Sequence, residues 1–254
     1  MLLIDEKLNS SIPKTLELYN NRDENALIKI IKQRSEADFL DINTALCENE
    51  KDMLIYMTEL VQKNSSAKIM LDSSDPGVIA EAAEYIKGDF AINSITAKER
   101  LELLPVIKKY NCYAVALPIE DNVPEDPEER LENALKIKKA CEKEGINTEK
   151  ILFDILITPL STDTEAGKKA SDTLKLFREN GMKTVCGLSN GSFGLPKRKI
   201  INSFYLSHLM TMGLDGAICD TEDLNIKTAV KCSEMLMGYD EYCMEYVMFA
   251  KEEL

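Results

Sequence analysis

Residues 69–76 read IMLDSSDP, and this stretch contains the pattern that decides the fold. The apolar run Ile69–Leu71 is followed by Asp72, and the pair Asp75-Pro76 then begins a helical segment. Apolar runs this short and continuous are typical of strands buried on both faces of a parallel sheet. Proline suits the first turn of a helix, because a backbone N–H there has no bonding partner within the helix. The stretch therefore predicts one strand–turn–helix unit.

The same unit recurs along the chain. Further short apolar runs lie at Leu2–Ile4, Phe39–Ile42, Phe90–Ile92, Ala114–Leu117, Ile151–Ile157, Thr184–Leu188 and Gly216–Cys219. The segments between them carry apolar residues at helical spacing, and Asp126-Pro127, Gly145 and Gly181 suit helix ends. Eight such units in 254 residues match the size of a (β/α)8 barrel. We predict an α/β fold, a single TIM barrel domain over residues 1–254, with trailing helices at Lys227–Leu236 and Tyr239–Lys251.

An open doubly wound sheet is the alternative fold. That fold places a glycine-rich phosphate loop after its first strand. The corresponding stretch here, Asp5–Asn9, contains no glycine. The sequence therefore favours the barrel.

The charge and the cysteines exclude several classes of function. There are 44 acidic and 31 basic residues, so the formal net charge is −13, which disfavours nucleic acid and anionic membranes as partners. The seven cysteines form no CxxC pair and the only histidine is His208, so we expect reduced thiols, a cytoplasmic protein and no metal bound directly. Met1–Ile4 is too short for a signal peptide, and no apolar run approaches the roughly 20 residues of a membrane span.

Polar side chains follow seven of the eight apolar runs. They are Glu6 and Asn9, Asp41 and Asn43, Asp72 and Ser73, Asn93 and Ser94, Asp154, Ser189 and Asn190, and Asp220. A lone aspartate in such a place usually caps a helix, but the carboxyl ends of barrel strands meet at one mouth, where active sites form. Carboxylates accept N–H groups and carboxamides both donate and accept. A ring of these groups suits a neutral heterocycle rich in N–H and C=O, and it would repel a phosphate.

Taken in order, these motifs resemble those of the methyltetrahydrofolate:corrinoid/iron-sulfur protein methyltransferase family. That family is a branch of the pterin-binding TIM barrels, which also include dihydropteroate synthase and the folate module of methionine synthase. The resemblance runs from Met1 to about Gly238. It rests on Asp5–Asn9, Asp41–Asn43, Leu71–Ser73, Ile92–Ser94, Asp154, Gly187–Asn190, Arg198 with Ile201-Asn202, Gly213–Asp215 and Asp220.

The resemblance implies a role for several residues. Asp72, Asn93 and Asp154 match the residues that hold the aminopyrimidine edge of the pterin. Asn190 matches the asparagine that reaches N5, the nitrogen that carries the methyl group, and Asp154 would support it in catalysis. The other pterin contacts implied are Ser189, Arg198 and Glu6.

The resemblance also implies the reaction and the partners. The expected reaction is an SN2 transfer of a methyl group between N5 of (methyl)tetrahydrofolate and the cobalt of a corrinoid (cobalamin) carried by a partner protein. The expected assembly is a homodimer, and the expected setting is one-carbon metabolism. The direction of transfer, the identity of the corrinoid protein and the choice between tetrahydrofolate and tetrahydromethanopterin stay open.

Several departures from the family pattern bear on the partner. Ile155 follows Asp154 where the family often has proline, Thr44-Ala45 replaces a frequent Gly-Pro, and the loop Gly191–Lys197 is unlike that of other members. We interpret them as adaptation to a different corrinoid protein, and the acidic loop Asp121–Pro127 is a candidate lid or partner surface.

The sequence also leaves alternative functions open. A dihydropteroate synthase-like pterin enzyme is one alternative, although the glycine-rich loop of that enzyme after its second strand is missing. A non-catalytic pterin-binding subunit of a corrinoid complex is another. An aldolase barrel is disfavoured, because no strand here ends in a lysine that could form a Schiff base.

Overall fold

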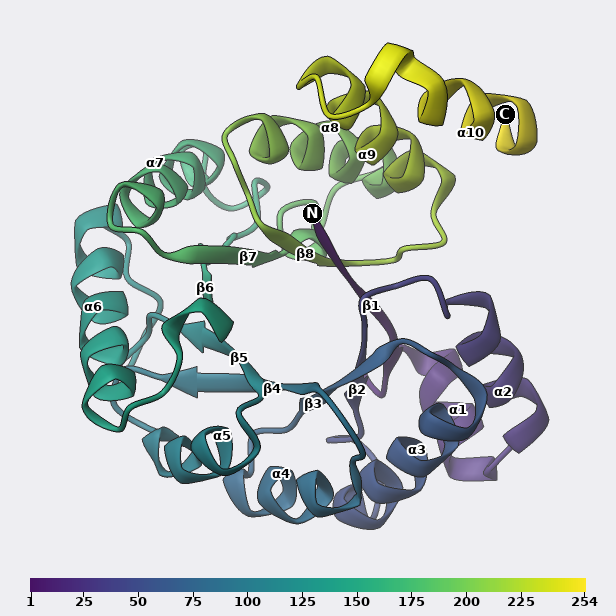
Figure 1. Ribbon diagram of the computed structural model, residues 1–254, viewed down its shortest axis with the longest axis vertical. Coiled ribbons are helices and arrows are strands. Elements are labelled where there is room, and N and C mark those ends of the chain that lie inside the picture. The colour runs from purple at the N-terminus through teal and green to yellow at the C-terminus, as the bar shows by residue number, and fades with distance from the viewer.

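The computed structural model describes residues 1–254 and consists of eight parallel strands closed into a barrel in sequence order (Figure 1). The strands are β1 (Leu2–Asn9), β2 (Phe39–Asn43), β3 (Lys68–Asp72), β4 (Phe90–Thr96), β5 (Tyr113–Leu117), β6 (Ile151–Asp154), β7 (Lys183–Gly187) and β8 (Gly216–Cys219). The pairing of β8 with β1 closes the sheet. The predicted TIM barrel is therefore confirmed, and the doubly wound sheet is excluded.

Helices surround the barrel as an outer ring (Figure 1). They are α1 (Pro13–Asn21), α2 (Glu24–Gln33), α3 (Glu50–Asn64), α4 (Pro76–Ala82), α5 (Leu104–Tyr110), α6 (Pro127–Lys143), α7 (Ala166–Glu179), α8 (Arg198–Thr211), α9 (Leu224–Leu236) and α10 (Met244–Glu253). Short 3₁₀ turns are η1 (Ala83–Tyr85), η2 (Leu101–Leu103), η3 (Thr148–Lys150), η4 (Leu188–Asn190) and η5 (Glu241–Cys243). The C-terminal α10 lies outside the ring, against α9. No helix is long and apolar enough to cross a membrane.

The helix ends form where the sequence predicts them. Asp75 and Asp126 cap α4 and α6, because their carboxylates accept the backbone N–H groups of Gly77 at 2.7 Å and Glu128 at 3.0 Å. Past the C-terminal ends of α6 and α7, Gly145 and Gly181 have φ angles of 72° and 65°. Such left-handed backbone is open to glycine at little cost, so these residues let the chain turn back toward the next strand.

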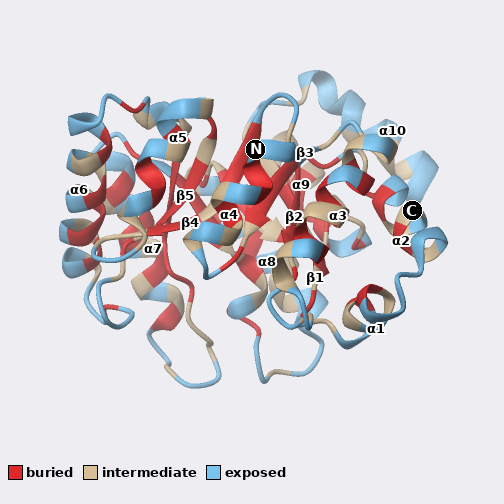
Figure 2. Ribbon diagram, turned by 90° about the horizontal axis from the view of Figure 1, so that it is seen from below, coloured by how far each residue is buried: buried red, intermediate tan, exposed pale blue.

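The barrel contains two apolar cores, one inside the sheet and one between the sheet and the helices. The inner cluster is Ile4, Phe39, Met70, Ala91, Val115, Leu152 and Val185. The larger outer cluster joins the opposite faces of the strands to the helices. Figure 2 shows the strands as the buried centre and the helices with exposed outer faces. Burial on both faces is the reason why the strands are nearly continuous apolar runs.

Three segments differ from the prediction. The helix predicted from Lys227 begins at Leu224 in α9, because the Asp223 carboxylate accepts the backbone N–H of Asn225 at 2.9 Å. The sixth strand ends at Asp154 and not at Ile157, because the Asp154 carboxylate accepts the backbone N–H of Leu156 at 2.7 Å and Leu156 takes a left-handed φ of 57°. The last helix begins at Met244 and not at Tyr239, because the Asp240 carboxylate accepts the first-turn N–H groups of Glu245 and Tyr246.

A buried arginine fixes the loop that follows β6. Arg130 on α6 is 1% exposed, and its guanidinium donates to the carbonyl oxygens of Pro124 at 2.9 Å and of Ile155 and Leu156 at 3.0 Å each. These carbonyls belong to the loops that follow β5 and β6. The side chain therefore ties two loops at the carboxyl end of the barrel to α6.

We predict that Arg130→Met lowers the free energy of unfolding by about 3 kcal/mol, because buried carbonyl oxygens lose a charged donor. The measurement is urea denaturation followed by circular dichroism. Lys139→Met, the corresponding change on the exposed face of the same helix, should leave the midpoint unchanged. Equal midpoints for Arg130→Met and Lys139→Met would contradict the role given to Arg130.

Candidate active site at the carboxyl end of the barrel

The site is built by the alternation of side chains along the strands. Successive residues of a strand face opposite sides of the sheet, so the residues two positions after the inner apolar cluster also face inward. These are Glu6, Asp41, Asp72, Asn93, Leu117, Asp154 and Gly187, and Asp220 follows the inward-facing Ile218 of β8 in the same way. Apart from Leu117 and Gly187, these residues form a polar ring that lies directly on an apolar layer filling the barrel.

The β2–β4 side of the ring is a chain of hydrogen bonds between carboxylates and carboxamides. Asn43 donates to Asp72 at 2.9 Å, and Asn93 donates to Asp41 at 3.3 Å. Strand register places Asp72 directly beside Asn43 and Asn93. The bond to Asp41 uses one of the two N–H groups of the Asn93 amide.

Two carboxyls in this part of the ring are crowded. Burial raises the pKa of Asp41 well above its usual range, and the neighbouring charge of Asp72 raises it further. Burial also raises the pKa of Asp72, whereas the hydrogen bond from Asn43 and the charge of Arg100 lower it. Burial and the charge of Asp72 therefore favour the protonated form of Asp41, whereas Asn43 and Arg100 favour the ionised form of Asp72.

Arg100 is a member of the site that the sequence did not reveal. It follows β4 in a loop, has a φ of 63°, and its guanidinium donates to the Ser94 hydroxyl at 3.2 Å and to the Ser73 carbonyl oxygen. The arginine therefore joins the loops after β3 and β4 and supplies positive charge beside Asp72. Its signal in the sequence was weak, because it lies several residues past the strand end.

Asp154 lies on the opposite side of the mouth from Asp72. The residue is 8% exposed, and burial raises its pKa to about 6, although the hydrogen bond from the Leu156 N–H and the nearby charge of Arg130 lower it. An acid with this pKa changes its protonation state near neutral pH, as a general acid or a switchable hydrogen-bonding group does.

Asn190 ends the η4 turn that follows β7. It is exposed, and its side-chain amide makes no hydrogen bond within the protein. The amide lies against Gly187, where an added Cβ would be 3.0 Å from Nδ2. The structure therefore presents this amide at the mouth, free to bond to a ligand.

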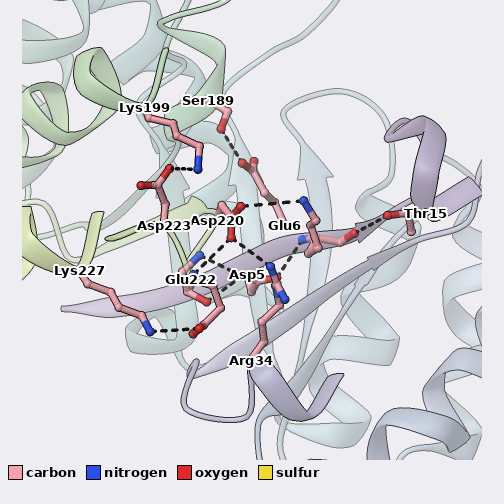
Figure 3. Close-up of polar contacts among 12 residues, drawn as sticks. Asp5, Glu6, Thr15, Arg34, Ser189, Lys199, Asp220, Glu222, Asp223 and Lys227 are labelled. Carbon is pink, nitrogen blue, oxygen red and sulfur yellow. Dashed lines mark hydrogen bonds and ion pairs between the residues drawn. The ribbon is translucent and has the colours of Figure 1, made fainter. Parts of the chain in front are cut away.

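The structure brings the predicted contacts Glu6, Ser189 and Arg198 together through hydrogen bonds. The Ser189 hydroxyl donates to Glu6 Oε1 at 2.5 Å, as Figure 3 shows. Arg198 donates to the Ser189 carbonyl oxygen at 2.7 Å and to the Ser192 hydroxyl at 3.0 Å.

Asp220 takes part in a charged network where the carboxyl end of β8 lies beside β1 (Figure 3). Arg34 lies 3.1 Å from the Asp5 carboxylate and 3.3 Å from that of Asp220. The Asp5 carboxylate also accepts the N–H and the hydroxyl of Thr221, at 3.0 and 2.7 Å. This network braces the closure of the barrel. No group of three or more His, Cys, Asp or Glu side chains could hold a metal ion.

Comparison with known proteins gives consistent results. The sequence model of the family described as "Pterin binding enzyme" matches residues 17–220. The chain is 26% identical over 257 residues to a methylcorrinoid:tetrahydrofolate methyltransferase of Eubacterium limosum, which covers 97% of this chain and 94% of that protein. It is 28% identical over 172 residues to the methionine synthase of Mycobacterium tuberculosis, which covers 61% of this chain and 14% of that protein.

Solved structures with a similar fold include two dihydropteroate synthases. One is from Xanthomonas albilineans in complex with 7,8-dihydropteroate, with a TM-score of 0.71 and 18% identity over 93% of each chain. The other is from Coxiella burnetii in complex with pteroic acid, with a TM-score of 0.72 and 17% identity over 92% of this chain and 93% of that one. At these identities the likeness shows a shared barrel.

The raised pKa of Asp154 predicts how stability depends on pH. The native state keeps this proton up to about pH 6 whereas the unfolded chain releases it near pH 4, so the contribution of Asp154 to stability falls as pH rises through that window. Asp154→Asn stays neutral throughout. We expect its unfolding free energy, relative to the wild type, to increase by about 2 kcal/mol between pH 4.5 and pH 7.5.

Urea denaturation at the two pH values measures this difference. Asp172→Asn removes an exposed carboxylate from α7 and controls for the change in net charge. A difference between Asp154→Asn and the wild type that does not vary with pH would show that Asp154 is ionised across the whole range.

Proposed function

Since this chain belongs to the family of pterin-binding enzymes, we propose that it is a methyltransferase that moves a methyl group between N5 of a tetrahydrofolate and the cobalt of a corrinoid protein. The observation that supports this most strongly is the unpartnered Asn190 amide at the rim of a ring of carboxylates and carboxamides. The similarity to a methylcorrinoid:tetrahydrofolate methyltransferase along 97% of the chain points to the same reaction. We propose that residues 1–254 act as one pterin-binding domain.

In this proposal, Asp72, Asn93 and Asp154 hold the pterin. The two carboxylates accept N–H groups of the aminopyrimidine edge, and Asn93, which gives one N–H to Asp41, offers its amide oxygen and its second N–H. The groups face one another across the inside of the barrel, above the apolar layer. They fix the ring so that N5 and its methyl group face the open mouth.

Asn190 acts on the reacting nitrogen. N5 is a poor leaving group in an SN2 displacement, so the negative charge that develops on it needs a hydrogen bond or a proton. The Asn190 amide donates such a bond, and Asp154 supports it through an ordered water. The cobalt of the partner's corrinoid accepts or donates the methyl group, and this chain orients the other reactant.

The assembly is also part of the proposal. Large apolar side chains are exposed on two of the C-terminal helices: Phe204 on α8 is 75% exposed and Leu236 on α9 is 78% exposed. Exposed apolar area of this kind marks a protein contact, and we propose that it is the surface of a homodimer. The corrinoid protein then docks at the mouth, where Asn190 lies.

A dihydropteroate synthase-like reaction is the alternative. The solved structures of that enzyme share the barrel with this chain, at 17–18% identity. That reaction displaces a pyrophosphate, and the crowded carboxylates of this mouth would repel it.

The function is tested by a spectroscopic transfer assay. We expect the protein to methylate free Co(I) cobalamin from 5-methyltetrahydrofolate, and to run the reverse reaction from methylcobalamin to tetrahydrofolate, with the absorbance of the cobalamin as the signal. A protein that binds folate in calorimetry but transfers no methyl group in either direction would instead be a pterin-binding subunit. Formation of dihydropteroate from a pterin pyrophosphate and p-aminobenzoate would establish the alternative enzyme.

The roles of Asn190 and Asp72 separate in kinetics. Asn190→Ala should lower kcat roughly 100- to 1,000-fold with little change in folate affinity, because the amide acts on charge that develops in the transition state. Asp72→Asn should weaken folate binding about 10- to 100-fold with a smaller effect on kcat, because it removes a charged hydrogen bond to the bound ring. Asn20→Ala, on the exposed surface of α1, is the control. Wild-type turnover in Asn190→Ala would remove this residue from the mechanism.

A further inference from the structure

The turn that carries Asn190 is held at several points that the mechanism above does not use. This turn, residues Gly187–Ser192, includes the 3₁₀ segment η4 and follows β7 directly. Asn190 is exposed within it, whereas Leu188, Gly191 and Ser192 are buried. The chain therefore anchors both sides of the turn and leaves one amide free.

The first anchor comes from β1. The Ser189 hydroxyl donates to Glu6 Oε1 at 2.5 Å, which joins the turn after β7 to the inward face of a strand on the far side of β8. Glu6 is largely enclosed, and Asp5 and Asp220 lie near it while Arg198 supplies positive charge from α8. A short bond from a hydroxyl to a carboxyl in such a place is stronger than one in water.

The second anchor comes from α8. The Arg198 guanidinium donates to the Ser189 carbonyl oxygen at 2.7 Å and to the Ser192 hydroxyl at 3.0 Å. The side chain of Ser189 is therefore hydrogen-bonded to β1, and its backbone carbonyl is hydrogen-bonded to α8. Asn190 is the next residue, so its position follows from that of Ser189.

Packing beneath the turn restricts the movement of its backbone and of the Asn190 amide. An added Cβ at Gly191 would lie 2.7 Å from the ring of Tyr205, and one at Gly187 would lie 3.0 Å from the Asn190 amide nitrogen. The backbone of the turn thus lies on Tyr205, and the Asn190 amide lies on Gly187. Neither position has room for a side chain without movement of its neighbour.

We propose that Glu6 and Ser189 form a latch that positions Asn190, and that they are positioning residues instead of direct pterin contacts. The inference rests on the proposed methyl transfer. A displacement of about 1 Å at a catalytic group can reduce a rate roughly 100-fold, so a latch on the residue beside Asn190 acts on turnover and not on ring binding.

The test compares Ser189→Ala with the wild type in two measurements. In the methyl-transfer assay, Ser189→Ala should lower kcat roughly 10- to 100-fold and leave the calorimetric Kd for tetrahydrofolate within about twofold. In hydrogen–deuterium exchange without substrate, the backbone amides of residues 188–192 should exchange faster than in the wild type. Ser171→Ala, which breaks a 2.9 Å contact with His208 on the helix surface, is the matched control and should change neither.

Variants of Glu6 test the other half of the latch and stand in for Ser189→Ala if that variant does not fold. Glu6→Gln keeps an oxygen that accepts the Ser189 hydroxyl and should retain most of kcat. Glu6→Ala should reproduce the loss of kcat and the faster exchange. Gly187→Ala should lower kcat without faster exchange, because it displaces the Asn190 amide while both anchors remain.

The outcomes separate the latch from the proposed function. Unchanged exchange in Ser189→Ala overturns the latch, whether or not the wild type transfers methyl groups. A weaker Kd with an unchanged kcat also overturns it and restores Ser189 as a pterin contact. A wild type that transfers no methyl group, with faster exchange in Ser189→Ala and Glu6→Ala, upholds the latch and removes the methyltransferase assignment.

Discussion

The structure depends on one constraint, the alternation of side chains along eight parallel strands that close on themselves. Most strands place one residue in an apolar layer that fills the barrel and a polar residue two positions later in the ring above it; β5 and β7 instead place Leu117 and Gly187 at that level. The same periodicity therefore stabilises the fold and collects the functional groups. A shift of one residue in any strand would turn its ring residue outward and put a different side chain into the layer below.

Carboxyl groups collected in the barrel mouth repel one another, and other groups of the site offset this repulsion. Asp41 and Asp72 are buried close to each other, and Glu6 lies near Asp5 and Asp220. Arg34 and Arg100 supply positive charge from behind the ring, and Asn43 and Asn93 donate hydrogen bonds within it. The net charge of −13 therefore does not describe this site, where guanidinium groups and hydrogen-bond donors offset the charge of the carboxyls.

The sequence predicts the barrel and the ring well, because both follow from local patterns. Short apolar runs ending in Asp72, Asn93 or Asp154 carry the two-residue period that places those residues inward. It does not predict Arg100, which enters from a loop, or the end of β6, which is set by a side-chain bond to the Leu156 N–H. The contact between Glu6 and Ser189 joins residues 183 positions apart, and no local pattern contains such a pairing.

The apolar layer inside the barrel has a kinetic consequence for the proposed reaction. The interior beneath the ring is closed by the apolar layer of Ile4, Met70, Val115 and their neighbours. In the proposed reaction, the folate and the corrinoid protein therefore share one entrance. Under the proposed function, a folate held in the ring lies between this layer and a corrinoid protein docked at the mouth, so the folate binds before the partner and leaves after it. Association and release then follow a compulsory sequence, and the residence time of the protein partner sets an upper bound on turnover.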